Sequence, residues 1–227
     1  MTDDYRRHTP VEEIELSIDP IALATREAEN AVAQFDAVLD LIDEAVRGAR
    51  GFRLRPSRIL DLHRIAMDGV NPLAGVFRHS PVTIAGSLHQ APCEHLVPNL
   101  IEEMCDWIEV HWSAPAIHLC AYVMWRLNWI HPFADGNGRT TRAVAYLVLC
   151  ARSGFALPGK HTIPEQIAEN RPPYYAALEL IDASIDTNNP DLSAMEELLS
   201  AGLKEQLDSA FSAATTGADD PTMRSFI

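Results

Sequence analysis

The sequence predicts a mainly α-helical protein with one small β-hairpin. Apolar residues recur at three- and four-residue spacing in several long segments, which is typical of amphipathic helices. Several of these segments begin with a proline or end beside a glycine, and both are common at helix boundaries. A short β-favouring run inside residues 75–92 predicts the hairpin.

Length and composition favour one domain of an ordinary globular class. A chain of 227 residues can bury roughly 70% of its unfolded surface, so it needs no disulfide or structural metal to fold. Its net charge of −14 argues against non-specific binding to nucleic acid or an anionic membrane. The polar start, MTDDYRRHTP, is no signal peptide, no apolar run is long enough for a membrane span, and the four cysteines form no C-x-x-C pair. We therefore expect a cytoplasmic protein with free thiols.

The first predicted helix covers residues 19–48, after a polar arm over residues 1–18. Asp19-Pro20 combines a capping carboxylate with proline at the first helical position, and Gly48 ends the pattern. Its apolar positions keep helical spacing: Ala28, Ala31, Val32, Phe35, Val38, Leu39, Ile42 and Val46.

The next two elements are a helix and the hairpin. Pro56 opens a helix that should end at Gly69. Val82-Thr83-Ile84 then predicts a strand and Ala85-Gly86-Ser87 a turn, so the chain should return through residues 88–90.

Helices then follow one another to the end of the chain. Pro98 opens one, and Pro115 opens another that Pro132 should end, because proline disfavours helical geometry in the residue before it. The helix predicted over residues 139–152 contains AVAYLVLCA, which is apolar on all sides and therefore buried. Two more helices are expected over residues 164–182 and 192–211, and a disordered tail is expected over residues 212–227.

The run HPFADGNGRTTR, residues 131–142, lies between two of these buried helices. Its Gly136-Asn137-Gly138 turn lets backbone N–H groups converge at a helix N-terminus, where the helix dipole also favours an anion. The side chain of Asn137 adds a donor. Arg139 and Arg142 lie on one face of the first turn, where their charge opposes the dipole unless a polyanion binds between them.

Two further residues of the run suit a bound nucleotide. Asp135 is a hard oxygen ligand of the kind that Mg²⁺ takes beside phosphates. His131, with an ordinary pKa of about 6.5, can act as a general base at neutral pH. Each element alone is more often structural, for example a capping Asp135 and two solvated arginines. Their combination in one run favours a phosphate site.

The run resembles the active-site motif of the Fic family, H-x-F-x-(D/E)-G-N-G-R-x-x-R, and matches every fixed position. The resemblance covers roughly residues 20–205, weakly outside this run. It implies a helical core over residues 49–211 with a β-hairpin flap, preceded by an inhibitory helix over residues 19–48. The implied activity is transfer of a nucleoside monophosphate, usually AMP from ATP, to a protein hydroxyl.

The resemblance also implies a role for each fixed position. His131 deprotonates a target Ser, Thr or Tyr, Phe133 anchors the loop, and Asp135 holds Mg²⁺. The remaining positions cradle the α-phosphate region or hold the outer phosphates: Gly136, Asn137, Gly138, Arg139 and Arg142. Attack at the α-phosphorus would then expel pyrophosphate.

Two other segments resemble parts of this family. Residues 75–92 look like the flap that aligns a target chain by strand addition, here through Val82, Thr83 and Ile84. A hairpin that only covers the core is an equal alternative. Tyr174 and Tyr175 resemble the segment beside the adenine, although a core role for one of them is at least as well supported, and the sequence does not decide which meets the base.

Residues 25–30, TREAEN, resemble the inhibitory motif (S/T)-x-x-x-E-(G/N) of many Fic proteins, with Thr25, Glu29 and Asn30 at the fixed positions. The resemblance implies that Glu29 pairs with Arg142 in place of the γ-phosphate, so that ATP binds with misplaced phosphates. An ordinary glutamate on a solvated helix face is the alternative.

Together these features predict a protein adenylyltransferase that uses ATP and Mg²⁺, modifies a protein substrate, and binds neither nucleic acid nor membrane. Two alternatives stay open: a hydrolase that removes AMP from a target, and a regulatory module that binds nucleotide without turnover. The target protein, the choice of ATP over other nucleotides, and homo-oligomer formation are not decided by the sequence.

Overall fold

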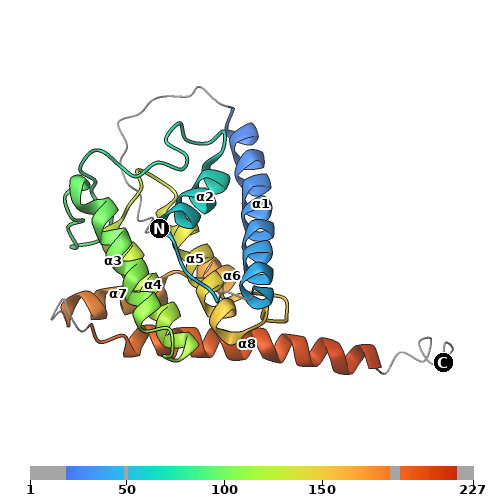
Figure 1. Ribbon diagram of the computed structural model, residues 1–227. Coiled ribbons are helices and arrows are strands. Elements are labelled where there is room, and N and C mark those ends of the chain that lie inside the picture. The colour runs from blue at the N-terminus through green and yellow to red at the C-terminus, as the bar shows by residue number, and fades with distance from the viewer. Residues whose placement is uncertain (1–18, 49–50, 185–189, 219–227) are drawn as a thin grey trace. The chain divides into compact units, whose positions relative to one another are not determined.

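The computed structural model describes residues 19–48, 51–184 and 190–218, and these are mainly helical (Figure 1). The chain divides into two compact units, Met1–Phe155 and Ala156–Ile227. The predicted arm over residues 1–18 and the last residues, 219–227, lie outside the described part. No described helix is long and apolar enough to cross a membrane.

Helix α1 (Pro20–Arg47) begins and ends as predicted, and it buries part of its apolar pattern together with two polar residues. The Asp19 carboxylate accepts a hydrogen bond from the N–H of Ile21 at 3.2 Å, and Gly48 is the C-terminal cap. The buried residues follow a four-residue spacing and are half polar: Asn30, Gln34, Val38 and Ile42. Val38 and Ile42 belong to the predicted apolar pattern, whereas Val32, Phe35 and Leu39 of the same pattern are 64%, 38% and 37% exposed.

The two buried amides explain why this face is chosen. Asn30 donates to the carbonyls of Asp68 (2.7 Å) and Ala66 (3.4 Å), at the end of α2 (Pro56–Met67). Gln34 donates to the carbonyl of Leu62 at 3.0 Å. The carbonyls of Ala66 and Asp68 lie at the end of the helix, where partners are scarce, so the Asn30 amide fastens α1 to the end of α2, and Gln34 adds a contact further along α2.

The rest of the first unit is built around α5 (Asn137–Ser153), against which α1, α2 and α4 (Ala116–Ile130) pack (Figure 1). Helix α3 (Val97–Val110), preceded by the short helix η1 (Glu94–Leu96), packs on α4. Every residue of α5 from Val144 to Cys150 is buried, which confirms the predicted buried helix. The ends of α4 and α5 that meet residues 131–136 are therefore held by a close-packed core.

The predicted β-hairpin is wrong: residues 75–92, all of which the structure describes, form no strand. The turn is present at Ala85-Gly86, where the N–H of Ser87 donates to the carbonyl of Ile84 at 3.2 Å. Ile84 is buried, so one residue of the β-favouring run is used as a core anchor. A strand needs a ladder of partners, and the β propensity of Val82-Thr83-Ile84 cannot supply one alone.

The second unit contains α6 (Ile163–Glu169), α7 (Pro172–Ala183) and α8 (Ser193–Ala218). The single helix predicted over 164–182 is thus two helices, because Pro172 and Pro173 lack the N–H groups that would continue α6. Helix α8 continues through Ala218, so the part of the predicted disordered tail from 212 to 218 is helical instead.

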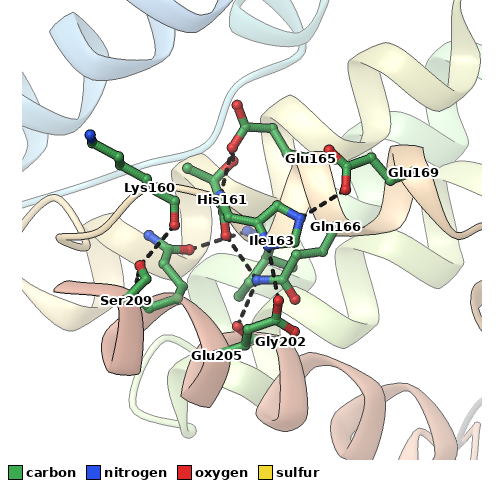
Figure 2. A network of polar contacts seen from close by, with 11 residues as sticks. Lys160, His161, Ile163, Glu165, Gln166, Glu169, Gly202, Glu205 and Ser209 are labelled. Atoms are coloured by element: carbon green, nitrogen blue, oxygen red, sulfur yellow. Dashed lines mark hydrogen bonds and ion pairs between the residues drawn. The ribbon is translucent and has the colours of Figure 1, made fainter. Parts of the chain in front are cut away.

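A polar network joins the start of α6 to α8 within this unit (Figure 2). The ring of His161 lies between two carboxylates, with Nε2 at 2.9 Å from Glu169 and Nδ1 at 2.9 Å from Glu205. The amide of Gln166 donates to the carbonyls of His161 (2.9 Å) and Gly202 (3.0 Å). His161 has a positive φ of 61°, which these contacts hold in place.

Candidate active site

His131 lies at the C-terminal end of α4, beside the candidate site. The N–H of His131 still donates to the carbonyl of Leu127 at 2.9 Å, and Pro132 then prevents the helix from continuing, as predicted. His131 itself is left-handed, with φ 49° and ψ 62°, a conformation that non-glycine residues adopt only when their surroundings impose it. The residue as a whole is 5% exposed, so the histidine is buried.

Asn137 closes the loop that follows His131. Its Oδ1 accepts from the N–H of Phe133 at 2.9 Å, and its Nδ2 donates to the carbonyl of Phe133 at 2.8 Å. Phe133 is fully buried, which agrees with its expected role as an anchor. The predicted donation from the Asn137 amide to a phosphate stays a prediction, and it would use the second hydrogen of Nδ2, which these two bonds leave unused.

His63 on α2 supports the same loop, and the sequence did not single it out. Its ring stacks on Phe133, with centroids 3.7 Å apart and an interplanar angle of 5°. Nδ1 accepts from the N–H of Gly75 at 2.9 Å, so the proton belongs on Nε2, which lies 3.0 Å from the carbonyl oxygen of Asp135. Burial lowers the pKa of His63 to about 4, so its ring is neutral at physiological pH. Its place in the apolar pattern of α2 resembles that of any core histidine.

Gly136 permits the turn into α5. Its φ is +74°, and a Cβ at this position would lie 2.5 Å from Sδ of Met67 and 3.2 Å from Nε2 of His63. Both the backbone conformation and the space therefore require glycine. Within the described chain no side chain caps the N-terminus of α5, so its first N–H groups face the site with the positive end of the helix dipole. This arrangement suits a phosphate.

Asp135 and Arg139 stand beside that N-terminus. Oδ1 of Asp135 accepts from the N–H of Gly136 at 2.6 Å, while Oδ2 lies 3.7 Å from Nη2 of Arg139. Arg139 also pairs with Glu27 of α1, with Nη1 and Oε1 3.0 Å apart. Arg142 lies on the same helix, one turn further on, and is partly buried. The two predicted phosphate ligands are thus on α5 as expected, and one of them is held by an acid from α1.

The predicted inhibitory residues all lie on α1 but face different surroundings. Glu29 is exposed, and its carboxylate lies 3.6 Å from Arg26 on the same helix. The Thr25 hydroxyl donates to the carbonyl of Ile21 at 2.9 Å, whereas Asn30 is buried against α2. The pairing of Glu29 with Arg142 therefore stays a prediction. The sequence did not single out Glu27. It lies three residues before Asn30 and therefore on the same side of α1 as this buried polar residue.

The residues present fit a Mg²⁺ ion that arrives with a nucleotide. Asp135 has a side chain 45% exposed, beside an N-terminus that suits phosphate. Among the described residues no three His, Cys, Asp or Glu side chains form a metal cluster. Mg²⁺ on nucleotides commonly takes one or two carboxylates and completes its shell with phosphate oxygens and water, which is the donor set available here.

The remaining predicted residues are placed as follows. In the flap segment Thr83 is exposed, Val82 is partly buried and Ile84 is buried, so these residues form no continuous strand edge.

Tyr174 and Tyr175 both lie at the start of α7 in the second unit, with ring centroids 5.8 Å apart. Tyr174 is 3% exposed, which favours the core role for that tyrosine. Contact of either ring with a base stays a prediction.

Comparison with known proteins agrees with this geometry. Residues 53–149 match the model of the Fic/DOC family. Protein adenylyltransferase fic-1 of Caenorhabditis briggsae is 31% identical over 157 residues, 66% of this chain and 29% of that protein. Protein adenylyltransferase Fic of Drosophila willistoni is 34% identical over 125 residues, 54% of this chain and 23% of that protein. The chain thus spans less than a third of the length of these curated relatives.

Solved structures show the same fold. A fragment of Fic-1 from C. elegans superposes with a TM-score of 0.67 at 23% identity, covering 90% of this chain and 57% of that one. A Fic domain containing signaling protein from Bacteroides thetaiotaomicron also gives a TM-score of 0.67 at 23% identity, over 82% of this chain and 73% of that one.

Proposed function

Because the chain belongs to the Fic/DOC family, we propose that it is a protein adenylyltransferase, which transfers AMP from ATP to a protein hydroxyl and releases pyrophosphate. One observation carries the proposal: the buried His131 caps the end of α4, and residues 132–136 alone separate it from the N-terminus of α5, which no side chain of its N-cap residue Gly136 caps. A base and an anion site are thereby fixed at the two ends of one short loop. The names of the curated relatives support the choice of AMP.

The reaction follows from these placements. His131 removes the proton from a Ser, Thr or Tyr hydroxyl of the target as its oxygen attacks the α-phosphorus. The new oxygen–phosphorus bond replaces the bond between the α-phosphorus and the bridging oxygen, and pyrophosphate leaves. The backbone N–H of Gly138 holds the phosphate chain at the turn that Gly136 permits, and Arg139 and Arg142 receive its outer charge. Fixed donors of this kind need no reorganisation during the reaction.

Mg²⁺ would be held by Asp135 together with the phosphates, and it would supply charge neutralisation for the leaving pyrophosphate. The Asp135 carboxylate is oriented for this role by the N–H of Gly136 and by Arg139. The target chain would align along residues 82–84 by backbone pairing, which would order a segment that has no strand of its own. Tyr174 or Tyr175 would stack on the adenine.

Helix α1 would act as a brake on this reaction through Glu29 and Arg142. The Glu29–Arg26 pair is 62% and 50% exposed, and exposed pairs of this kind contribute only about 0–1 kcal/mol. Loss of the contact with Arg26 would therefore cost Glu29 little if it paired with Arg142. The Glu27–Arg139 pair supports the same idea, because it already commits one phosphate-binding arginine to an α1 carboxylate.

The proposal is tested by incubating the Glu29→Gly protein with ATP labelled at the α-phosphate and a cell lysate. Covalent label on protein is expected, and its loss in the Glu29→Gly/His131→Ala double variant identifies the base. Label that is instead released from a pre-modified target would indicate the hydrolase. Tight ATP binding without any covalent label would indicate the regulatory module.

A further inference from the structure

We propose that Arg78 is a positioning residue of this active site, whose guanidinium fixes the peptide group of His131 and ties it to both ends of residues 80–92. The inference rests on the proposed AMP transfer for its kinetic part. Arg78 lies in the segment expected to be a flap, outside the motif of residues 131–142.

The contacts of Arg78 converge on the end of α4. Its Nε donates to the carbonyl of His131 at 2.8 Å, and Nη2 lies 3.4 Å from the carbonyl of Ile130. Its backbone N–H donates to the carbonyl of Pro132 at 2.9 Å. The main chain and side chain of Arg78 thus contact the carbonyls of residues 130, 131 and 132, on both sides of the proposed base.

The same guanidinium reaches the flap segment on its other side. Nη1 donates to the carbonyl of Ser80 at 3.2 Å, and Nη2 donates to the carbonyl of Pro92. The segment between these residues has no ladder of its own, so Arg78 links its two ends. Any displacement of residues 80–92 by a bound target chain is therefore transmitted to the His131 carbonyl through a single rigid group.

Arg78 is buried, so water cannot readily replace these hydrogen bonds. Arg78 is 3% exposed, and every hydrogen bond described for its side chain goes to a backbone carbonyl. Burial lowers its pKa, while the nearby Glu94 carboxylate raises it, and an arginine remains charged under these conditions. A cation at the C-terminus of α4 also complements the helix dipole. The Arg78 guanidinium is therefore stabilised in this position, and moving it would break its hydrogen bonds to the backbone carbonyls.

The conformation of His131 explains why this matters for a base. Its N–H is fixed to Leu127 and its carbonyl to Arg78, so both peptide groups that flank the residue are held. The left-handed backbone between them determines where the imidazole points. A shift of about 1 Å in a catalytic group can lower a rate by roughly a hundredfold. None of the described side-chain hydrogen bonds of Arg78 goes to α5, where ATP is proposed to bind.

Arg152 provides a matched control in the same unit. Its Nε donates to the carbonyl of Ala114 at 3.0 Å and its Nη2 to the carbonyl of Ser113 at 3.0 Å. It therefore makes the same kind of contact, at the loop before α4 rather than at the end that carries His131. Lysine in place of either arginine keeps the charge but loses the planar fork.

The experiment compares Arg78→Lys with Arg152→Lys, each in the Glu29→Gly background of the full chain. Transfer of α-labelled AMP gives kcat and KM for ATP, and NMR of the histidine ring carbons gives the His131 signal, assigned with His131→Ala. We expect Arg78→Lys to lower kcat at least about tenfold with KM for ATP within about twofold, and to shift the His131 signal. Arg152→Lys should leave kcat within about twofold of its parent and the signal unmoved.

Several outcomes would overturn the inference. An Arg78→Lys protein with unchanged kcat, or an equal loss in Arg152→Lys, would deny Arg78 a specific role. Unfolding of Arg78→Lys, or a matching rise in KM, would make Arg78 a residue of the fold alone. If the parent transfers no AMP, the proposed function fails by itself, and the His131 ring signal decides the positioning claim, since an unmoved signal in Arg78→Lys contradicts it.

Discussion

The guanidinium of Arg139 lies 3.0 Å from the carboxylate of Glu27, so an acid of α1 holds an arginine at the N-terminus of α5. Both side chains are partly shielded, at 26% and 43% exposure. Any polyanion that binds at this N-terminus must therefore compete with a carboxylate of the same chain. Helix α1 is fastened in this position by Asn30 and Gln34, which bind carbonyls of α2.

Glu27→Gln should strengthen ATP binding, because Arg139 is released for the phosphates. A partly exposed pair is worth about 1 kcal/mol, which corresponds to roughly a fivefold lower dissociation constant. Isothermal titration with ATP measures this. Asp40→Asn, which removes an exposed carboxylate elsewhere on α1, is the control for net charge and should change the affinity far less. Equal gains in both variants would show that the Glu27–Arg139 pair does not compete with ATP.

Glu29→Gly should raise the initial rate of AMP transfer, including self-modification, by at least about tenfold, which corresponds to about 1.4 kcal/mol of barrier. The expected gain is in rate rather than affinity, because ATP is proposed to bind the wild type with misplaced phosphates. Rates with α-labelled ATP decide the point. Equal rates in wild type and Glu29→Gly would remove the brake.

His63 should make stability depend on pH in the acid range. Its folded-state pKa, about 4, is below its ordinary value of 6.5, so the unfolded chain binds the proton more readily. The contribution is therefore complete above pH 6.5 and is lost as pH falls from 6.5 towards 4, by up to about 3 kcal/mol. Denaturant titrations across this range test it. In His63→Phe, which keeps the stacking on Phe133, this part of the pH dependence should disappear.

His161, in the second unit, should have the opposite effect on the pH dependence of stability. The hydrogen bond with Glu169 is the largest cause that raises its pKa, followed by attraction to that carboxylate and contacts with Glu205. The folded state thus favours the charged ring, and its stabilising effect is present at low pH and lost as pH rises through the folded pKa. The protection factors of α6 amides, which correct for the intrinsic pH dependence of hydrogen exchange, should fall as pH rises through this pKa. The same fall in His161→Gln would show that another group titrates.

The sequence predicts well what depends on local chemistry. Pro132 ends α4, Gly136 has the positive φ that the turn needs, and the apolar stretch of α5 is buried. These features depend on a few neighbouring residues, so they can be read without knowing the fold. The run that they frame is also the segment in which the fixed positions of the family motif lie.

The errors concern contacts between distant segments. The strand expected at Val82-Thr83-Ile84 has no partner, and sequence alone does not say whether one is present. The apolar pattern of α1 favours Val32 and Phe35, yet the buried face carries Asn30 and Gln34, because the end of α2 offers carbonyls for their amides. The supporting roles of His63 and Arg78 depend on the loop at 131–135, more than fifty residues away, so no local pattern marks them.

The most direct measurement follows the fate of each phosphate. The Glu29→Gly protein is incubated with a target-containing lysate and ATP labelled at either the α- or the γ-phosphate, beside Glu29→Gly/His131→Ala. Because kinases in a lysate also transfer the γ-phosphate to proteins, only protein label that the double variant lacks is counted. Transfer of AMP predicts such label from the α position alone and release of the γ label as pyrophosphate, while the double variant binds ATP with similar affinity. His131-dependent protein label from the γ position, or undiminished α label without His131, would contradict AMP transfer by this site.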